Sequence, residues 1–216
     1  MGAGPTLDEL VVADDPATWR ELGFAVEGDV CRIGAVRVRM AGRAAGRGIV
    51  SWALRGIAAV ELDGLPTTRS GRPPCAGAAH PNATESVDHV VVLSPDFDRT
   101  VGAFESAGLE LRRVREAGAG EHSFRQGFFR LGEVILELVE RLDAPPGPAA
   151  FWGLVFVTAD LDGAAARLGE RVKAPHDAVQ PGRRIATVRR EAGLSAAAAF
   201  MSPDPRGRTP GAPAGG

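Results

Sequence analysis

Glu137 has surroundings that require a chemical explanation. Strand alternation places its side chain on one face together with Ile135 and Val139. A carboxylate among apolar neighbours is costly unless it is paired or bound as a ligand. Glu137 therefore either pairs with an arginine, for which Arg125 and Arg184 are candidates, or belongs to a binding site.

A histidine and a row of polar and aromatic side chains lie in other strand-like runs. His89 is in the run 87–93, and one face of a later run carries His122, Phe124, Gln126 and Phe128. This face either lines a pocket or is exposed at a sheet edge. For His89, one interpretation is a neutral imidazole that is hydrogen-bonded inside a cleft.

The elements that must position these residues follow the order strand, helix, strand, strand, strand. We expect a first strand at 87–93, a short helix at 96–108 and further strands at 109–115, 122–130 and 134–141. The run Pro145–Pro148 ends this module, because prolines and glycine interrupt regular structure.

A copy of the module follows. The segment 153–162 lies over 89–98 without a gap, so that 153 corresponds to 89 and 162 to 98. A helix at 161–168 and strand-like segments at 170–174, 184–189 and 195–201 continue the copy. Such an internal repeat of one supersecondary unit carries more weight than any single motif.

The N-terminal segment 7–62 has a weaker pattern of the same kind, roughly β-α-β-β-β. Asp15 followed by Pro16 marks a helix start. Residues rich in Pro, Gly, Ala and Thr then form a linker, and a Pro/Gly-rich tail predicts disorder. The predicted organisation is a degenerate half-module (1–66), a linker (67–85), paired modules (86–143 and 150–202, together 86–202) and a tail (203–216).

The repeat predicts a cleft. The helix of a βαβββ unit covers one face of its sheet and leaves the other face open. Two copies related by a pseudo-twofold axis bring their open concave faces together, and small-molecule sites favour such concavities.

The duplicated order of strand, Asp-Phe-Asp or Asp-Leu-Asp, short helix and a last strand with a Leu-Glu-Leu run resembles the vicinal oxygen chelate family of glyoxalases, bleomycin-resistance proteins and dioxygenases. The resemblance covers residues 86–202. It implies an α+β fold in which tandem βαβββ modules form a cleft between mixed sheets.

The resemblance also implies a metal site. Metal-using members of the family take a His from the first strand and a Glu from the last strand of a module, and His89 and Glu137 match these positions. Imidazole and carboxylate together suit Zn, Ni, Fe or Mn. The metal would act as a Lewis acid on adjacent substrate oxygens.

The second module departs from this pattern. Gly153 stands at the position of His89, and residues 195–201 contain no His, Asp or Glu. Zinc sites usually use three or four protein ligands, so two make an incomplete set. Completion would require a partner chain or Glu9 on the corresponding strand of the N-terminal module.

The run Ala196–Ala199 gives the last strand of the copy little bulk. Either a neighbouring element approaches closely, or the small side chains leave room for an organic ligand. The residues that we expect to line the pocket are His122, Arg125, Gln126, Phe128, Trp152, Val155 and Phe200.

Composition excludes several classes of partner. A net charge of −2 argues against binding to nucleic acid, which needs a basic face. No apolar run approaches the roughly 20 residues of a membrane span. We expect a cytoplasmic protein without membrane contact. Cys31 and Cys75 are too few for a disulfide framework or a thiolate metal motif.

The sequence leaves three hypotheses for function. The first is a glyoxalase-like protein that binds a small organic molecule in the cleft without a complete metal site. The second is a divalent-metal-dependent lyase, isomerase or dioxygenase that uses His89 and Glu137, and the third is a structural or interaction role. The odd number of half-modules predicts that 7–62 packs on the edge of the pair or mates with its equivalent in a homodimer.

Overall fold

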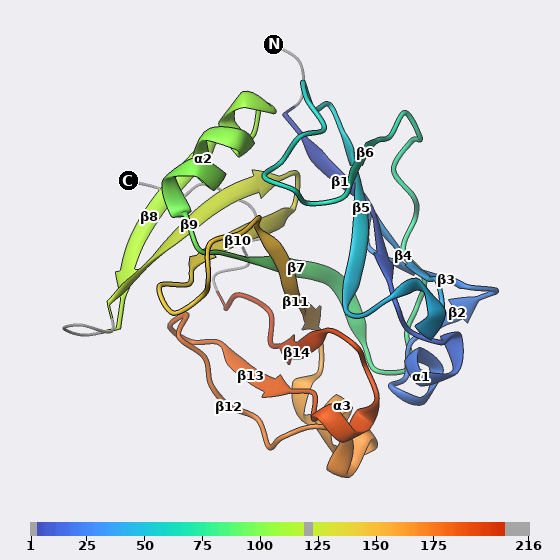
Figure 1. The fold of residues 1–216 in the computed structure, drawn as a ribbon. Coiled ribbons are helices and arrows are strands. Elements are labelled where there is room, and N and C mark those ends of the chain that lie inside the picture. Colours follow the sequence, from blue (N-terminus) through green and yellow to red (C-terminus); the bar gives the residue numbers. More distant parts are fainter. Residues whose placement is uncertain (1–3, 119–122, 206–216) are drawn as a thin grey trace.

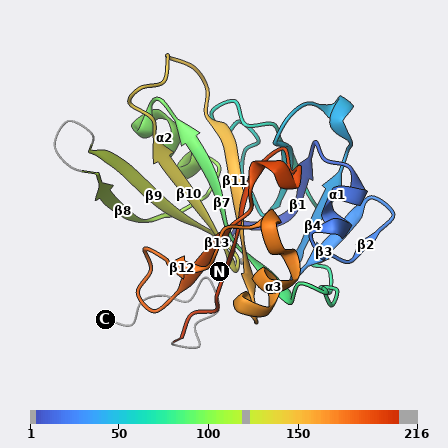
Figure 2. The same ribbon diagram turned by 90° about the horizontal axis from the view of Figure 1, so that it is seen from below.

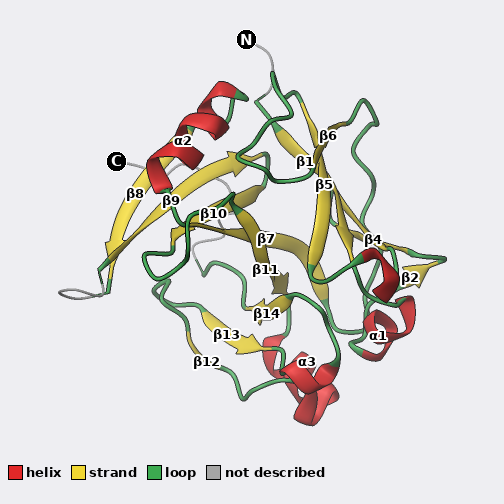
Figure 3. Cartoon of the chain, viewed as in Figure 1, coloured by secondary structure: helices red, strands yellow, loops and turns green. Residues whose placement is uncertain are grey.

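The structure, a computed structural model, describes residues 4–118 and 123–205. Within these residues the strands form two sheets, one of eight strands and one of six, and the helices are short (Figure 3). His122 lies outside the described residues, and so do residues 206–216 of the predicted disordered tail (203–216).

The eight-stranded sheet contains the two predicted modules, which confirms the fold class (Figure 1). Its strand order is β12-β13-β14-β11-β7-β10-β9-β8. The first module consists of β7 (Thr84–Ser94), α2 (Phe97–Ser106), β8 (Leu111–Ala117), β9 (Phe124–Leu131) and β10 (Val134–Glu140). The second consists of β11 (Ala150–Thr158), α3 (Leu161–Leu168), β12 (His176–Asp177), β13 (Arg184–Thr187) and β14 (Ala197–Met201).

The two modules are joined through their first strands. β7 and β11 pair antiparallel at the centre, while each first strand pairs parallel with the last strand of its own module. His89 lies opposite Val155, and Val91 lies opposite Gly153. This register is what a pseudo-twofold axis requires, because the repeat makes 153 equivalent to 89 and 155 equivalent to 91.

The repeated aspartates start the two equivalent helices. Asp96 accepts a hydrogen bond from the backbone N–H of Arg99, and Asp160 accepts one from Gly163. Each side chain satisfies a backbone donor that has no partner within the helix. The sequence repeat therefore reflects a helix-capping device as well as the order of strands.

The predicted strand at 170–174 is wrong. A 3₁₀ helix, η3 (Gly169–Arg171), follows α3, and only Val172 forms a bridge, to Val188. Gly169 has a positive φ of 55°, a conformation that turns the chain at the end of the helix. A second 3₁₀ helix, η4 (Arg190–Ala192), precedes β14.

The six-stranded sheet has the order β2-β3-β4-β1-β5-β6. Its elements are β1 (Thr6–Val12), α1 (Pro16–Glu21), β2 (Val26–Glu27), β3 (Val30–Ile33), β4 (Val36–Met40), η1 (Arg43–Ala45), β5 (Ile49–Arg55) and β6 (Thr67–Arg69). β1 pairs parallel with β4 and antiparallel with β5, as β7 does with β10 and β11. The N-terminal β-α-β-β-β order is therefore complete at Met40, and β5 and β6 stand where a further module would have its first and last strands.

The segment between β6 and β7 is held firmly at several points, although its composition predicted a linker. His80 is only 8% exposed and is therefore buried. Its Nδ1 accepts a hydrogen bond from the backbone N–H of Ala25, so Nε2 donates to the carbonyl of Arg32. Asn82 donates to the carbonyl of Leu22.

The two sheets share one hydrophobic core and lie side by side in both ribbon views (Figure 2). Trp19 of α1 and Phe24 pack against Phe156 of β11 at centroid distances of 5.9 and 5.1 Å. Phe24 also stacks on Phe200 of β14. The N-terminal segment therefore packs on a face of the module pair. No described helix is long and apolar enough to cross a membrane.

Candidate functional site in the cleft between the modules

A cavity of about 480 Å³ lies between the two modules of the eight-stranded sheet. Its walls come from β7, β9 and β10 on one side and from β11, β13 and β14 on the other. The lining residues are His89, Val91, Leu93, Phe124, Gln126, Glu137, Val139, Arg141, Trp152, Leu154, Val155, Ile185, Thr187 and Ala197–Ala199. Most of these side chains are apolar, and the polar ones, apart from Thr187 of β13, lie on β7, β9 and β10 or directly after β10.

His89 and Glu137 come together in this cavity. They lie on adjacent parallel strands, where His89 is opposite Ile135 and Glu137 is opposite Val91. The distance between His89 Nε2 and Glu137 Oε2 is 3.6 Å, which is longer than a hydrogen bond. Both side chains are largely buried, and they place an imidazole and a carboxylate against the apolar walls.

Asp88 is a bulge residue whose carboxylate binds the ring nitrogen of His89 that does not face Glu137. His89 lies opposite Val155 and Val87 lies opposite Phe156, so β11 has no residue opposite Asp88. A bulge breaks the alternation of side chains along a strand. Asp88 can therefore reach the neighbouring ring, and its Oδ2 lies 2.7 Å from His89 Nδ1.

Arg183 forms a buried ion pair with Asp88. Its Nη1 lies 2.7 Å from Asp88 Oδ1. Burial raises the pKa of Asp88, but the hydrogen bond from His89 and the charges of His89 and Arg183 outweigh burial and lower the pKa from its ordinary value of 3.8. An ionised carboxylate only accepts hydrogen bonds. Nδ1 of His89 therefore carries a proton, and Nε2 faces Glu137.

Gln126 links Glu137 to an arginine. Its Nε2 donates to Glu137 Oε1 at 2.6 Å, and its Oε1 accepts from Arg115 Nε at 2.9 Å. Because a guanidinium has only donors, Arg115 fixes which end of the amide points to Glu137. The resulting row runs from Arg115 to Arg183 through Gln126, Glu137, His89 and Asp88.

The expected pairing of Glu137 with Arg125 or Arg184 is wrong. Arg125 faces α2, where it pairs with Asp98 at 2.8 Å and lies over the ring of Phe97, and it also pairs with Glu140 of β10 at 2.7 Å. Arg184 pairs with Asp162 at the start of α3. Alternation along β9 explains the difference, because Gln126 and Arg125 point to opposite faces.

Two further predicted pocket residues stand apart from the lining. Phe200 is 1% exposed and belongs to the core, because it points to the face opposite Ala199. Phe128 lies opposite Glu137 in the ladder between β9 and β10, yet it is not among the lining residues. Arg125 is absent from the lining as well, whereas Gln126, Trp152 and Val155 belong to it.

Trp152 lies at the mouth of the cavity and is 53% exposed. Phe151 lies opposite Val92 and Gly153 opposite Val91, so Trp152 is a second bulge residue in the central strand pair. The bulge turns the indole out of the ordinary alternation. A large aromatic side chain that remains half exposed at a cavity mouth offers a surface for stacking.

The donors of the described residues do not fit the metal site that the resemblance implies. Gly153 and Ala199 occupy the positions equivalent to His89 and Glu137. A Cβ at Gly153 would lie 2.5 Å from the carbonyl oxygen of Ala197, so β14 excludes any side chain there. In the described part of the chain, no group of three or more His, Cys, Asp or Glu residues is placed to hold a metal ion.

The N-terminal sheet has a counterpart of this site, in which an acidic residue stands at the position of His89 and a basic residue at the position of Glu137. β5 has no residue opposite Asp8, so Asp8 is a bulge residue like Asp88. Glu9 then corresponds to His89, and Arg39, which lies opposite Val11, corresponds to Glu137. Arg39 Nε lies 3.4 Å from Glu9 Oε1, so a direct ion pair occupies the place of the open His–Glu pair.

Asp8 organises a buried ion cluster beside this pair. It accepts hydrogen bonds from Ser70 Oγ at 2.6 Å and from Arg72 Nε at 2.9 Å, and it also pairs with Arg37 and Arg55. Burial raises the pKa of Asp8, but the hydrogen bonds and the arginine charges lower it overall. The segment after β6 thus supplies one cation, Arg72, and one hydroxyl donor, Ser70, to the first strand of the N-terminal sheet.

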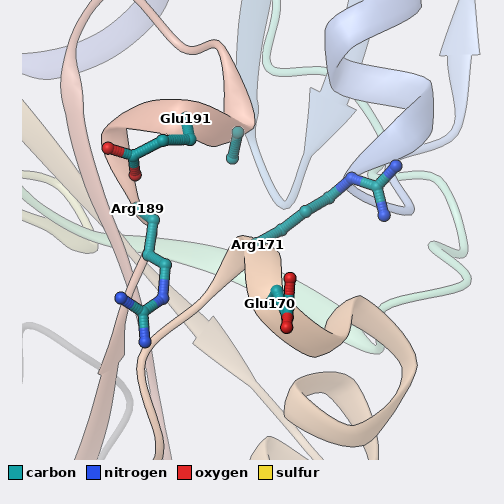
Figure 4. A pocket seen from close by; sticks show the side chains of 5 residues that line it. Glu170, Arg171, Arg189 and Glu191 are labelled. Carbon is teal, nitrogen blue, oxygen red and sulfur yellow. The ribbon is translucent and has the colours of Figure 1, made fainter.

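A larger depression of about 600 Å³ lies near η3 and η4 (Figure 4). Its lining includes Glu170, Arg171, Arg189, Glu191 and Ala192. The charged side chains point in different directions, and Arg171 reaches toward Glu21 at 3.9 Å. The charged side chains of its described lining do not converge on one point, so the cleft between the modules is the candidate site.

Solved structures of known proteins resemble this chain. A variant of 4-hydroxymandelate synthase from Streptomyces coelicolor is 18% identical, with 92% of this chain and 91% of that chain covered and a TM-score of 0.60. A xylose isomerase-like TIM barrel/4-hydroxyphenylpyruvate dioxygenase fusion protein is 14% identical, with a TM-score of 0.61; 93% of this chain but about half of that chain, 49%, is covered.

A methylmalonyl-CoA epimerase from Mycobacterium tuberculosis is also similar, with 18% identity, a TM-score of 0.45 and coverage of 57% of this chain and 91% of that chain. No family model matches the sequence, and no curated protein matches it.

The fold of this chain is therefore that of the vicinal oxygen chelate proteins, as its repeat predicted. At these identities the likeness defines the fold alone, and the activity must be argued from the cleft.

Proposed function

We propose that this chain is a glyoxalase-like protein that binds a small organic molecule in the cleft between its modules, without a complete metal site of the family. The observation that carries the proposal is the asymmetry of the cavity. One side presents His89 and Glu137, whereas the equivalent positions on the other side, Gly153 and Ala199, have little or no side chain.

The composition of the cavity supports an organic ligand. Small-molecule sites combine mostly apolar walls with a few convergent polar groups. Here Val91, Leu93, Val155 and Ile185 belong to the walls, and Gln126 joins the polar pair. The volume of about 480 Å³ is within the usual range for such sites. A purely structural role is less well supported, because side chains do not fill the cavity.

A divalent-metal-dependent enzyme is the second candidate. The approach of His89 and Glu137 to 3.6 Å favours it, because these are the two ligand types that the family uses. A bound metal would supply Lewis-acid chemistry. Its remaining ligands would have to come from outside the described lining of the cavity.

Ligand binding can be tested by blocking the cleft. A compound library is screened by thermal unfolding against the full chain and two variants. Ala199→Leu adds bulk to the cavity floor, and Ala166→Leu makes the same change at an exposed position of α3. We expect compounds that stabilise the wild type and Ala166→Leu but bind Ala199→Leu at least tenfold more weakly.

Equal binding by all three forms would place the ligand elsewhere and contradict the proposal. Titration calorimetry with the best compounds measures affinity directly. It therefore distinguishes a variant that has lost the binding site from one whose fold is only less stable. Thr187→Leu provides a second block from β13 if Ala199→Leu fails to fold.

A further inference from the structure

We infer, on the basis of the proposed function, that the ligand of the cleft is an amine: an apolar body whose protonated amino group binds between Glu137 and His89.

Among the described residues no arginine or lysine forms an ion pair with Glu137, and only the imidazole of His89 approaches its carboxylate, at 3.6 Å. Asp88 is balanced by Arg183 at 2.7 Å, and the side chain of Glu137 accepts from the neutral amide of Gln126. The Glu137 side chain is only 15% exposed. A buried carboxylate that lacks a compensating charge is costly, so a cationic group in the ligand would stabilise it.

The geometry of the pair favours a donor with at least two hydrogens. Asp88 holds the Nδ1 proton of His89, so the lone pair of a neutral imidazole lies on Nε2 and faces the cavity. Glu137 Oε2 lies 3.6 Å from Nε2, too far for a hydrogen bond between the two groups. A single ammonium nitrogen can lie within about 3 Å of both atoms and donate to each.

The arginine in the described lining, Arg141, is already engaged. Arg141 binds Asp143 through two hydrogen bonds, of 2.7 and 3.1 Å. This bidentate pair neutralises the guanidinium at the mouth of the cavity. An anionic ligand would therefore compete with Asp143 for the guanidinium, whereas an ammonium ion leaves the pair intact.

The apolar part of the ligand has its place at the mouth and on the second module. Trp152 exposes its indole there, and Val155 and Ala199 leave space above the polar pair. Stacking on the indole and burial against the aliphatic walls suit an aromatic body. Arylalkylamines therefore combine both features that the cavity presents.

Three probes of similar shape test the inference: naphthylmethylamine, naphthylmethanol and naphthoate. Affinity for the full chain is measured by calorimetry, and Glu137→Gln is compared with Glu105→Gln, the same change at an exposed position of α2. We expect the amine to bind about tenfold or more tightly than naphthoate, since hydrogen bonds between charged groups are the strong ones.

Glu137→Gln should weaken the amine by about tenfold and leave naphthylmethanol within a factor of about three, while Glu105→Gln changes neither. Tightest binding of naphthoate would overturn the inference and leave cleft binding standing. An amine affinity that Glu137→Gln does not alter would also overturn it. Absence of binding by all three probes, together with no stabilising compound in the library, would overturn both proposals. The comparison of probes on the wild type does not depend on how any variant folds.

Discussion

His80 shows how one buried side chain can make stability depend on pH. Burial lowers its pKa from the ordinary value of 6.5, and the hydrogen bond to the carbonyl of Arg32 opposes this only in part. The unfolded chain therefore binds a proton more readily than the folded chain. The contribution of neutral His80 to the free energy of unfolding is fully present above the pKa of the unfolded state. It is lost as the pH falls through about 6.5 and below.

We expect His80→Gln to lower the free energy of unfolding near neutral pH, because the variant disturbs two hydrogen bonds to backbone. The difference from the wild type should shrink as the pH falls below about 6.5, where the wild type loses its advantage. Urea unfolding at several pH values measures this. The exposed His176→Gln is the control, and a difference that stays constant with pH would contradict the account.

Asp8 should be the most sensitive carboxylate of the N-terminal sheet. It is fully buried, and Asp8→Asn removes the anion that balances Arg37 and Arg55. Breaking a buried ion pair by removing one partner costs about 3–5 kcal/mol. Urea unfolding at neutral pH should detect this loss, while the exposed Asp29→Asn should remain close to the wild type; equal stability of the two variants would count against the cluster.

The sequence predicted His89, Glu137, Gln126 and Val155 because repeat position and strand alternation place them, whereas the predicted Trp152 lines the cavity at a bulge that breaks this alternation. It missed the partners of His89, because a one-residue bulge breaks the alternation on which the prediction relies.

A signal for the missed partner Asp88 was present. The run Leu7-Asp8-Glu9-Leu10 matches Val87-Asp88-His89-Val90 position by position, and both aspartates prove to be bulge residues. No local pattern marks Arg183, which a distant loop supplies.

At the scale of elements, the close contact between β11 and β14 decides what the cleft can contain. Gly153→Ala would place a Cβ 2.5 Å from the carbonyl oxygen of Ala197. The strands must separate to admit it, which typically costs about 1–3 kcal/mol. Thermal unfolding measures the loss.

The matched control is Gly102→Ala in α2, where a Cβ meets nothing within 4 Å. There the same substitution should stabilise the protein by up to about 1 kcal/mol, because alanine favours a helix. A Gly153→Ala variant as stable as the wild type would mean that β14 moves away from β11 at little cost. The steric argument against a metal-binding side chain at this position would then fail.

The predicted elements are most accurate where pattern and capping agree. The aspartates at 96 and 160 marked both helix starts, and alternation marked β9 and β10. The strand predicted at 170–174 failed because Gly169 turns the chain into a 3₁₀ helix. The N-terminal pattern was assigned to one module over 7–62. In the structure β5 pairs antiparallel with β1, as the first strand of a further module would.

At the scale of the molecule, the two sheets should unfold together. Phe24 is 3% exposed and touches Trp19, Phe156 and Phe200, so it joins the N-terminal segment to the second module. Phe24→Ala should cost about 3–5 kcal/mol. For a chain of this size that lowers the melting temperature by roughly 10 °C.

Calorimetry and circular dichroism should record one transition for both the wild type and Phe24→Ala. Val60→Ala, at a 46% exposed position, is the control and should change little. Two separate transitions, with only the earlier one shifted by Phe24→Ala, would show that the sheets are energetically independent. The sequence alone could not predict this joint core, because it arises from contacts between segments that are far apart along the chain, such as Phe24 and Phe156.

The metal content of the untagged full chain tests the central claim most directly. The protein is incubated with Zn, Ni, Fe or Mn, dialysed and analysed by mass spectrometry, beside Glu137→Ala and Glu105→Ala. Because Gly153 and Ala199 supply no donors, we predict no stoichiometric metal in any of the three forms. One metal ion per chain that is retained by the wild type and Glu105→Ala but lost in Glu137→Ala would contradict a metal-independent binding cleft.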